Sequence, residues 1–174
     1  LGAMWDDAEH LYSSANCNDG GQPTLVVCKL DRGAWFHLRC ADGTEFLIDR
    51  LGKHLWATWP EPLTVEDTAT YLLGPMIGFV LLLRGTPALH ASAINVGGQA
   101  IALVGPGGAG KSTTAAGFAR MGYSVLSDDA VTLAGEPGEL MVHPGYPCIR
   151  LWPESADALF GARDALPLLT PNWD

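Results

Sequence analysis

A glycine-rich stretch fits the phosphate-binding pattern G-x-x-x-x-G-K-[ST]. Its members are Gly105, Pro106, Gly107, Gly108, Ala109, Gly110, Lys111 and Ser112, followed by Thr113. Glycines let main-chain N–H groups turn inward around phosphate oxygens, and a following helix N-terminus adds partial positive charge. Lys111 would reach the β- and γ-phosphates of a nucleotide, and the Ser112 hydroxyl would bind Mg²⁺. Residues 105–113 therefore predict a nucleotide-phosphate site.

Two adjacent acids, Asp128 and Asp129, follow an apolar run at 123–127. A phosphoryl-transfer site needs an acid that binds metal and a group that positions the nucleophile. In a parallel α/β layout both acids would lie at the C-terminal edge of a strand, where ligands gather. One would face Mg²⁺, and the other would accept a proton from an incoming hydroxyl. The alternative is that either acid caps a turn, because Asp is common at strand ends.

A histidine and an arginine are the remaining candidates for the same site. If residues 91–96 pair antiparallel with 100–104, His90 emerges beside the loop, where it could orient a carboxylate or tune its pKa. A lone histidine is more often a structural residue, and His143 has a weaker case than His90. Arg150 could contact phosphate or an acidic substrate group, but a salt bridge is equally consistent with its position.

The elements around these residues have the order that a phosphate loop requires. The apolar run 100–104 predicts a buried strand before the loop, and 113–121 predicts a helix after it. This context disfavours the alternative of a chance Gly-Lys-Ser in a glycine-rich turn. Further elements are predicted as a hairpin strand at 91–96, strands at 123–127, 130–134 and 140–143 with a turn at 136–139, and a short helix at 154–160.

The first half of the chain has the pattern of a small antiparallel sheet. Its predicted elements are a loop or loosely docked arm at 5–23, strands at 25–28, 35–39, 45–49 and 54–58, and an Asp-Gly turn at 41–44. A helix at 65–83 should follow, with Thr64 and Asp67 at its N-terminal cap. Pro75 should kink or break this helix. Its second half is apolar on nearly every side, which predicts burial between layers.

Length and composition suit one domain with a small appendage. The chain has 174 residues, of which 48% are hydrophobic. The turn at 84–87 predicts a join between an N-terminal β-rich region with the buried helix (1–85) and a nucleotide domain (86–174). Residues 167–174 end without a closing element, which predicts either a disordered tail or a continuation of the domain beyond them.

The net charge and the cysteine spacing predict which partners and which cellular compartment the protein has. The net charge is −9 and no basic patch is visible, so we expect no nucleic-acid partner, whereas a basic protein or peptide would be acceptable. Four cysteines without C-x-x-C spacing predict neither a zinc site nor disulfides, but reduced thiols in a cytoplasmic protein. The first residues lack a basic region followed by an apolar stretch, so we expect no secretion signal. The uncharged run 68–83 falls short of the ~20 residues that span a bilayer, so no membrane partner is expected.

Three motifs in order resemble the HPr kinase/phosphorylase family, especially the shorter bacterial HPr-kinase-like serine kinases. They are LHASA at 89–93, the glycine-rich loop, and VLSDD at 125–129. The resemblance covers about residues 86–160. It implies a P-loop nucleotide-binding domain of the phosphoenolpyruvate-carboxykinase-like and HPr-kinase-like type. Some of these relatives phosphorylate a precursor peptide in lasso-peptide clusters.

The resemblance also implies roles for the site residues. Asp128 would be the general base toward a substrate serine, His90 would support it, and Asp129 would help Ser112 to bind Mg²⁺. Bifunctional family members have a Glu-Ile-Arg-Gly signature, whereas the nearest match here is CIRL at 148–151. This departure argues against a reverse phosphorylase reaction and against HPr as the substrate, but the sequence alone does not decide either point. Family members are often oligomers, which allows a homo-oligomer here.

The residues and the resemblance together predict an ATP- and Mg²⁺-dependent serine/threonine kinase acting on a small protein or peptide. Lys111 and the loop amides would stabilise the transferring charge. Two alternatives remain at this point: a small-molecule kinase on the same fold, and a nucleotide-binding regulatory module with little turnover.

Overall fold

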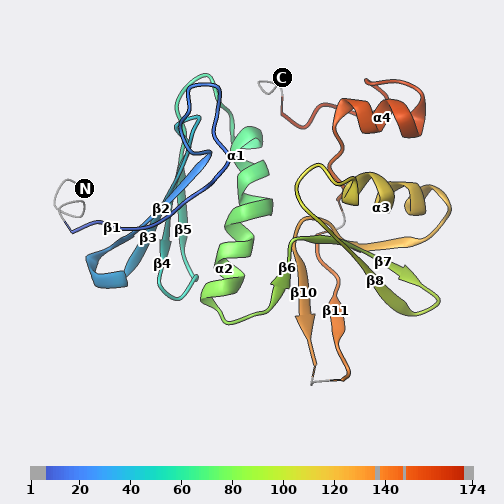
Figure 1. Ribbon diagram of the computed structural model, residues 1–174, viewed down its shortest axis with the longest axis horizontal. Coiled ribbons are helices and arrows are strands. Elements are labelled where there is room, and N and C mark those ends of the chain that lie inside the picture. Colours follow the sequence, from blue (N-terminus) through green and yellow to red (C-terminus); the bar gives the residue numbers. More distant parts are fainter. Residues whose placement is uncertain (1–6, 136–137, 147, 171–174) are drawn as a thin grey trace. The chain divides into compact units, whose positions relative to one another are not determined.

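The computed structural model describes residues 7–135, 138–146 and 148–170 (Figure 1). The chain forms two compact units, which divide between Tyr71 and Leu72. This division falls inside the helix predicted at 65–83, and not at the turn predicted at 84–87. The second half of that helix belongs to the second unit, where it contacts a short strand at 88–89.

The first unit contains a five-stranded antiparallel sheet whose strands follow chain order. The strands are β1 (Glu9–Ser13), β2 (Leu25–Leu30), β3 (Trp35–Cys40), β4 (Glu45–Asp49) and β5 (Leu55–Thr58). The predicted meander is confirmed. At the Asp-Gly turn between β3 and β4, Gly43 has a φ of 90° and the Thr44 N–H donates to Asp42 Oδ1 at 2.8 Å. Leu38 of β3 lies opposite Val27 and Phe46, and all three are buried.

Strand β1 corrects the prediction of a loop or loose arm at 5–23. All five of its residues are exposed, so no apolar alternation marks it in the sequence. It forms by antiparallel pairing with β2, in which Glu9 lies opposite Lys29 and forms an ion pair with it. Main-chain pairing, which the side-chain pattern does not report, thus defines this edge strand.

The helical segment consists of α1 (Val65–Tyr71), a π-helical turn η3 (Leu72–Met76) and α2 (Ile77–Leu83). The predicted cap is confirmed, because the Thr64 N–H donates to Asp67 Oδ2 at 2.8 Å and the Asp67 N–H donates to Thr64 Oγ1 at 3.3 Å. Pro75 lies inside the π-helical turn, so the interruption that proline was expected to cause takes this form.

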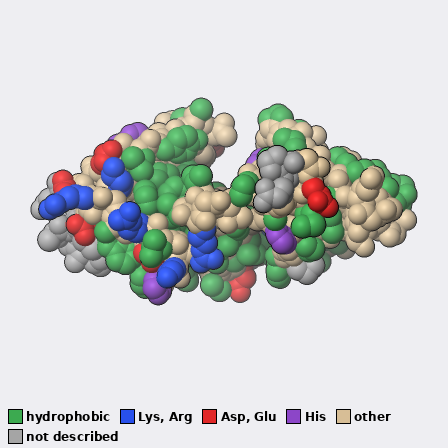
Figure 2. Space-filling view, turned by 90° about the horizontal axis from the view of Figure 1, so that it is seen from below, with side chains coloured by type: hydrophobic (Ala, Val, Ile, Leu, Met, Phe, Trp, Pro, Cys, Tyr) green, Lys and Arg blue, Asp and Glu red, His purple; other side chains and the backbone are tan. Residues whose placement is uncertain are grey.

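The prediction that the second half of this helix is buried is wrong. No residue of α2 is buried, and the side chain of Leu82 remains 70% exposed. Hydrophobic side chains also reach the surface at many places on the face drawn in Figure 2. Val65–Leu83 has the length and apolar composition of a helix that could cross a membrane, although helices of soluble proteins meet the same criterion.

Besides η3 and α2, the described part of the second unit contains two three-stranded antiparallel sheets, ordered β8-β7-β9 and β11-β10-β6, and the helices α3 and α4. Its elements are β6 (Ala88–Leu89), β7 (Ala91–Val96), β8 (Gln99–Val104), α3 (Lys111–Arg120), β9 (Ser124–Ser127), β10 (Val131–Ala134), β11 (Met141–His143) and α4 (Pro153–Phe160). The predicted hairpin, strands and helices of this half are confirmed. The turn predicted at 136–139 and the tail predicted at 167–174 lie partly outside the described residues.

The sheet that carries the loop differs from the parallel layout that was expected. Strand β7 lies between β8 and β9 and pairs antiparallel with both, so β8 and β9 run in the same direction without being neighbours. Their C-terminal ends therefore meet the start of β7 at one edge. Strand β8 was expected to be buried, but it is an edge strand, and Val104 is 68% exposed.

Candidate active site

The glycine-rich loop at 105–110 connects β8 to α3 and has the conformation that its glycines permit. Gly108 and Gly110 have φ values of 76° and 82°, in the left-handed region that favours glycine. The Ala109 N–H donates to the Pro106 carbonyl at 3.2 Å, which closes the turn. Gly110 is the N-cap of α3, so the first helical N–H groups lie next to the loop. A helix N-terminus of this kind favours anions.

Lys111 places its cationic group over the same loop. Its Nζ donates to the carbonyls of Gly105 and Pro106, both at 3.0 Å. The ammonium group and the helix N-terminus thus lie together at the end of β8. Both features fit the phosphate groups of a nucleotide.

Asp128 is joined to the end of the loop by a hydrogen bond from Ser112. The hydroxyls of Ser112 and Ser92 donate to Asp128 Oδ1 at 3.0 Å and 2.5 Å, and the Arg150 main-chain N–H donates to Oδ2 at 3.4 Å. Ser92, on β7, is fully buried. Sequence analysis did not single out Ser92, although a lone hydroxyl between Ala91 and Ala93 was a usable signal. The three elements that converge here are β7, α3 and the end of β9.

The Asp129 side chain contacts other residues than the Asp128 side chain does. The Asp129 φ of 64° is left-handed, and its carboxylate forms an ion pair with the Arg150 guanidinium. The salt bridge considered for Arg150 is therefore confirmed. Ser112, which was expected to share Mg²⁺ with Asp129, instead contacts Asp128. The left-handed backbone explains this difference, because it separates the directions of two consecutive side chains.

His90 also differs from its expected role. Its Nδ1 lies 3.1 Å from the main-chain carbonyl of Asp129, and no hydrogen bond joins it to the Asp128 carboxylate among the described residues. Since a carbonyl only accepts, Nδ1 must carry the proton in this contact. His90 is thus close to the acidic pair, as the hairpin pairing predicted, but it contacts the main chain.

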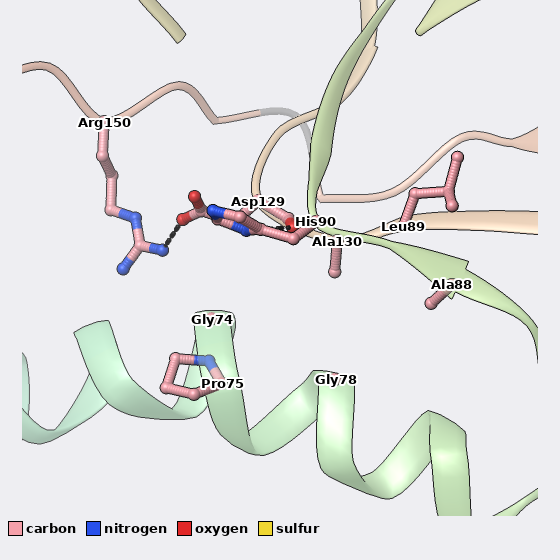
Figure 3. A pocket seen from close by; sticks show the side chains of 9 residues that line it. All are labelled: Gly74, Pro75, Gly78, Ala88, Leu89, His90, Asp129, Ala130 and Arg150. Carbon is pink, nitrogen blue, oxygen red and sulfur yellow. Dashed lines mark hydrogen bonds and ion pairs between the residues drawn. The ribbon is translucent and has the colours of Figure 1, made fainter. Parts of the chain in front are cut away.

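A cavity of about 360 Å³ lies beside Asp129 (Figure 3). It is lined by Gly74, Pro75, Gly78, Ala88, Leu89, His90, Asp129, Ala130 and Arg150. Figure 3 shows Arg150 reaching toward Asp129, with the helix that carries Gly74, Pro75 and Gly78 on the other side. All these residues belong to the second unit. Apart from Arg150, His90 and Asp129, the side chains around the cavity are apolar or absent.

The residues at the loop fit a magnesium ion. No group of three His, Cys, Asp or Glu residues gathers in the part of the chain that the structure describes. Mg²⁺ does not require such a group, because it keeps several waters and is often bound by one or two carboxylates plus substrate phosphates. The Ser112 hydroxyl and the Asp128 carboxylate supply hard oxygen donors of this kind.

Comparison with known proteins does not assign the chain to a family. No family model matches it, and no match is found among the curated proteins or the solved structures. The resemblance to the HPr kinase/phosphorylase family thus rests on the three sequence motifs.

Proposed function

We propose that this protein is an ATP-dependent kinase that transfers a γ-phosphoryl group to a serine or threonine hydroxyl of a protein or peptide. The observation that carries the proposal is the contact between Ser112 and Asp128. It joins the last residue of a phosphate-binding pattern to an acid at the end of a separate strand. A kinase needs this pairing of a hydroxyl and a carboxylate, whereas a simple glycine turn does not.

The donor side of the reaction follows from the loop. Main-chain N–H groups at the start of α3 and the Lys111 ammonium would stabilise negative charge on the transferring phosphoryl group. When bound, Mg²⁺ would neutralise charge on the phosphate oxygens, held by Ser112 and Asp128. Buried Ser92 donates to the same Asp128 oxygen as Ser112 and helps to hold the carboxylate in place. This arrangement orients the donor before an acceptor arrives.

The acceptor side needs a carboxylate that receives a hydroxyl proton, and the two adjacent acids supply it. The residues at 148–151 read CIRL, without the Glu and Gly of the Glu-Ile-Arg-Gly signature. We therefore propose transfer in the forward direction only.

The test is incubation of the purified chain with [γ-³²P]ATP and Mg²⁺, with HPr and a seryl peptide library as separate acceptors. We expect phosphoserine or phosphothreonine in the library and little or none in HPr. Lys111→Met should remove the label. If ADP forms no faster than background with every acceptor, the protein is a nucleotide-binding module and the proposal fails.

A further inference from the structure

We infer that the cavity beside Asp129 is the acceptor site, and that Asp129, not Asp128, receives the acceptor hydroxyl. The acceptor class is a serine or threonine flanked by small uncharged residues. This inference rests on the proposed kinase function. It assigns the two acids differently from the family resemblance, because their contacts in the structure differ.

The two carboxylates differ in how much of their hydrogen-bonding capacity is used. Asp128 Oδ1 accepts from two hydroxyls, and its Oδ2 accepts from a main-chain N–H. Asp129 Oδ2 is paired with Arg150, while its Oδ1 has no hydrogen bond to any described residue. The Asp129 side chain is 26% exposed and lines the cavity. Asp129 is therefore the acid with an oxygen available to an incoming hydroxyl.

Two neighbours hold this acid in place. The Arg150 guanidinium pairs with its carboxylate, and His90 Nδ1 donates to its main-chain carbonyl. The two contacts fix both the side chain and the backbone of Asp129. Asp129 and Arg150 form an ion pair at the polar end of the cavity. An uncharged hydroxyl suits this end better than a charged side chain.

The rest of the cavity selects for small size. Its volume of about 360 Å³ lies near the lower limit of the roughly 300–1,000 Å³ typical of ligand pockets. Pro75, Ala88, Leu89 and Ala130 supply short apolar side chains. A Cβ added at Gly78 would meet no atom within 4 Å, so no side chain fills the space above this turn of the helix. A short peptide segment with small residues fits, and a folded surface does not.

The acceptor oxygen forms a bond to the γ-phosphorus while its proton moves to Asp129 Oδ1. The bond between the γ-phosphorus and the β–γ bridging oxygen breaks, and its electron pair leaves with ADP. Asp129 then returns the proton to solvent. In a loose transition state the main task of such a carboxylate is to orient the hydroxyl.

The test fills the cavity without disturbing the fold. Gly78→Leu adds a side chain where the Cβ meets nothing, and Leu favours a helix over Gly. Gly117→Ala is the matched control, because this glycine lies in α3, where a Cβ would be 3.9 Å from Leu159. The probes are a seryl peptide with alanine on both sides and the same peptide with tryptophan on both sides, with [γ-³²P]ATP as donor.

We expect the native chain to label the alanine-flanked peptide far better than the tryptophan-flanked one. Gly78→Leu should lower this labelling about 100-fold, as expected when an acceptor is displaced by ~1 Å or more, with ATP affinity within a few-fold of native. Gly117→Ala should change neither. Asp129→Asn should lower transfer by roughly 10²–10⁴-fold with Mg²⁺-dependent ATP affinity retained, whereas Asp128→Asn should weaken that affinity.

Each contrary result has a separate meaning. Full labelling by Gly78→Leu, or retained transfer by Asp129→Asn, overturns the inference and leaves the kinase proposal standing. Equal labelling of the two peptides overturns the acceptor class. If the native chain does not bind ATP, or labels neither peptide nor the library, the proposed function itself fails and the acceptor site fails with it.

Discussion

Removal of the Ser92 hydroxyl should lower the stability of the β8-β7-β9 sheet in the second unit. Ser92 is fully buried on β7, the middle strand of its sheet, and it donates to Asp128 Oδ1 at 2.5 Å. Ser92→Ala deletes this donor and keeps nearly the same shape. Since the site is buried, water does not readily take the place of the hydroxyl. The Asp128 carboxylate would keep its contact with Ser112 but lose its shortest hydrogen bond.

The expected loss of stability follows from the type of hydrogen bond that is removed. A hydrogen bond to a charged group contributes about 1.5–3 kcal/mol, compared with about 1 kcal/mol for a neutral one. Because about 1.4 kcal/mol corresponds to a tenfold change in an equilibrium constant, opening of the sheet should become roughly 10- to 100-fold more frequent. The matched control is Ser124→Ala at an exposed position of β9, which should change stability by no more than about 0.5 kcal/mol.

Hydrogen exchange of the β7 amides is the appropriate assay. The chain has two units, so global denaturation does not report on one of them alone. Exchange at Ala91–Val96 measures opening of the relevant sheet directly. We expect Ser92→Ala to accelerate it by the factor given above, and to weaken Mg²⁺-dependent ATP binding through the displaced Asp128. Native-like exchange in Ser92→Ala, or equal acceleration in Ser124→Ala, would refute the assignment.

The remaining predictions concern three other side chains. Lys111→Met should lower ATP affinity with native-like circular dichroism, because the Lys111 ammonium donates hydrogen bonds only to loop carbonyls among the described residues. Unchanged binding would contradict the loop assignment. Arg150→Ala should lower transfer at an unchanged KM for ATP, and Arg150→Lys should restore part of it, since lysine keeps the charge without the planar fork. Burial, followed by nearby Asp42, raises the pKa of the Cys40 thiol to about 12. Iodoacetamide at pH 8 should therefore alkylate exposed Cys17 and Cys148 but spare Cys40, as mass spectrometry would show.

Local signals in the sequence predicted the fold well where they report directly on backbone geometry. The Asp-Gly turn at 41–44, the cap at Thr64 and the hairpin at 91–104 all correspond to local side-chain or glycine requirements. Strand β1 was missed because its contribution is main-chain pairing, with every side chain exposed. The burial of α2 and β8 was overestimated because apolar composition does not reveal how many neighbours an element has.

The candidate site shows the same limit. Strand direction was enough to predict that His90, the loop and the acids lie at one edge. The division of labour between Asp128 and Asp129 could not be predicted, because it depends on the left-handed φ of Asp129. The cavity was equally hidden, since it is lined by the helix around Gly78 and by residues distant from it in sequence. Such contacts arise from tertiary packing and leave no periodic pattern.

The central claim is that the phosphate loop, with Ser112 and Asp128, donates a γ-phosphoryl group to a hydroxyl. Its most direct test is parallel labelling of a seryl peptide library with [γ-³²P]ATP and [α-³²P]ATP in the presence of Mg²⁺. We predict label on serine or threonine from the γ-labelled nucleotide alone, released as phosphoserine or phosphothreonine on acid hydrolysis. Label from the α-position would show nucleotidyl transfer, and binding of ATP without label from either position would show that no group is transferred; each result would contradict the claim.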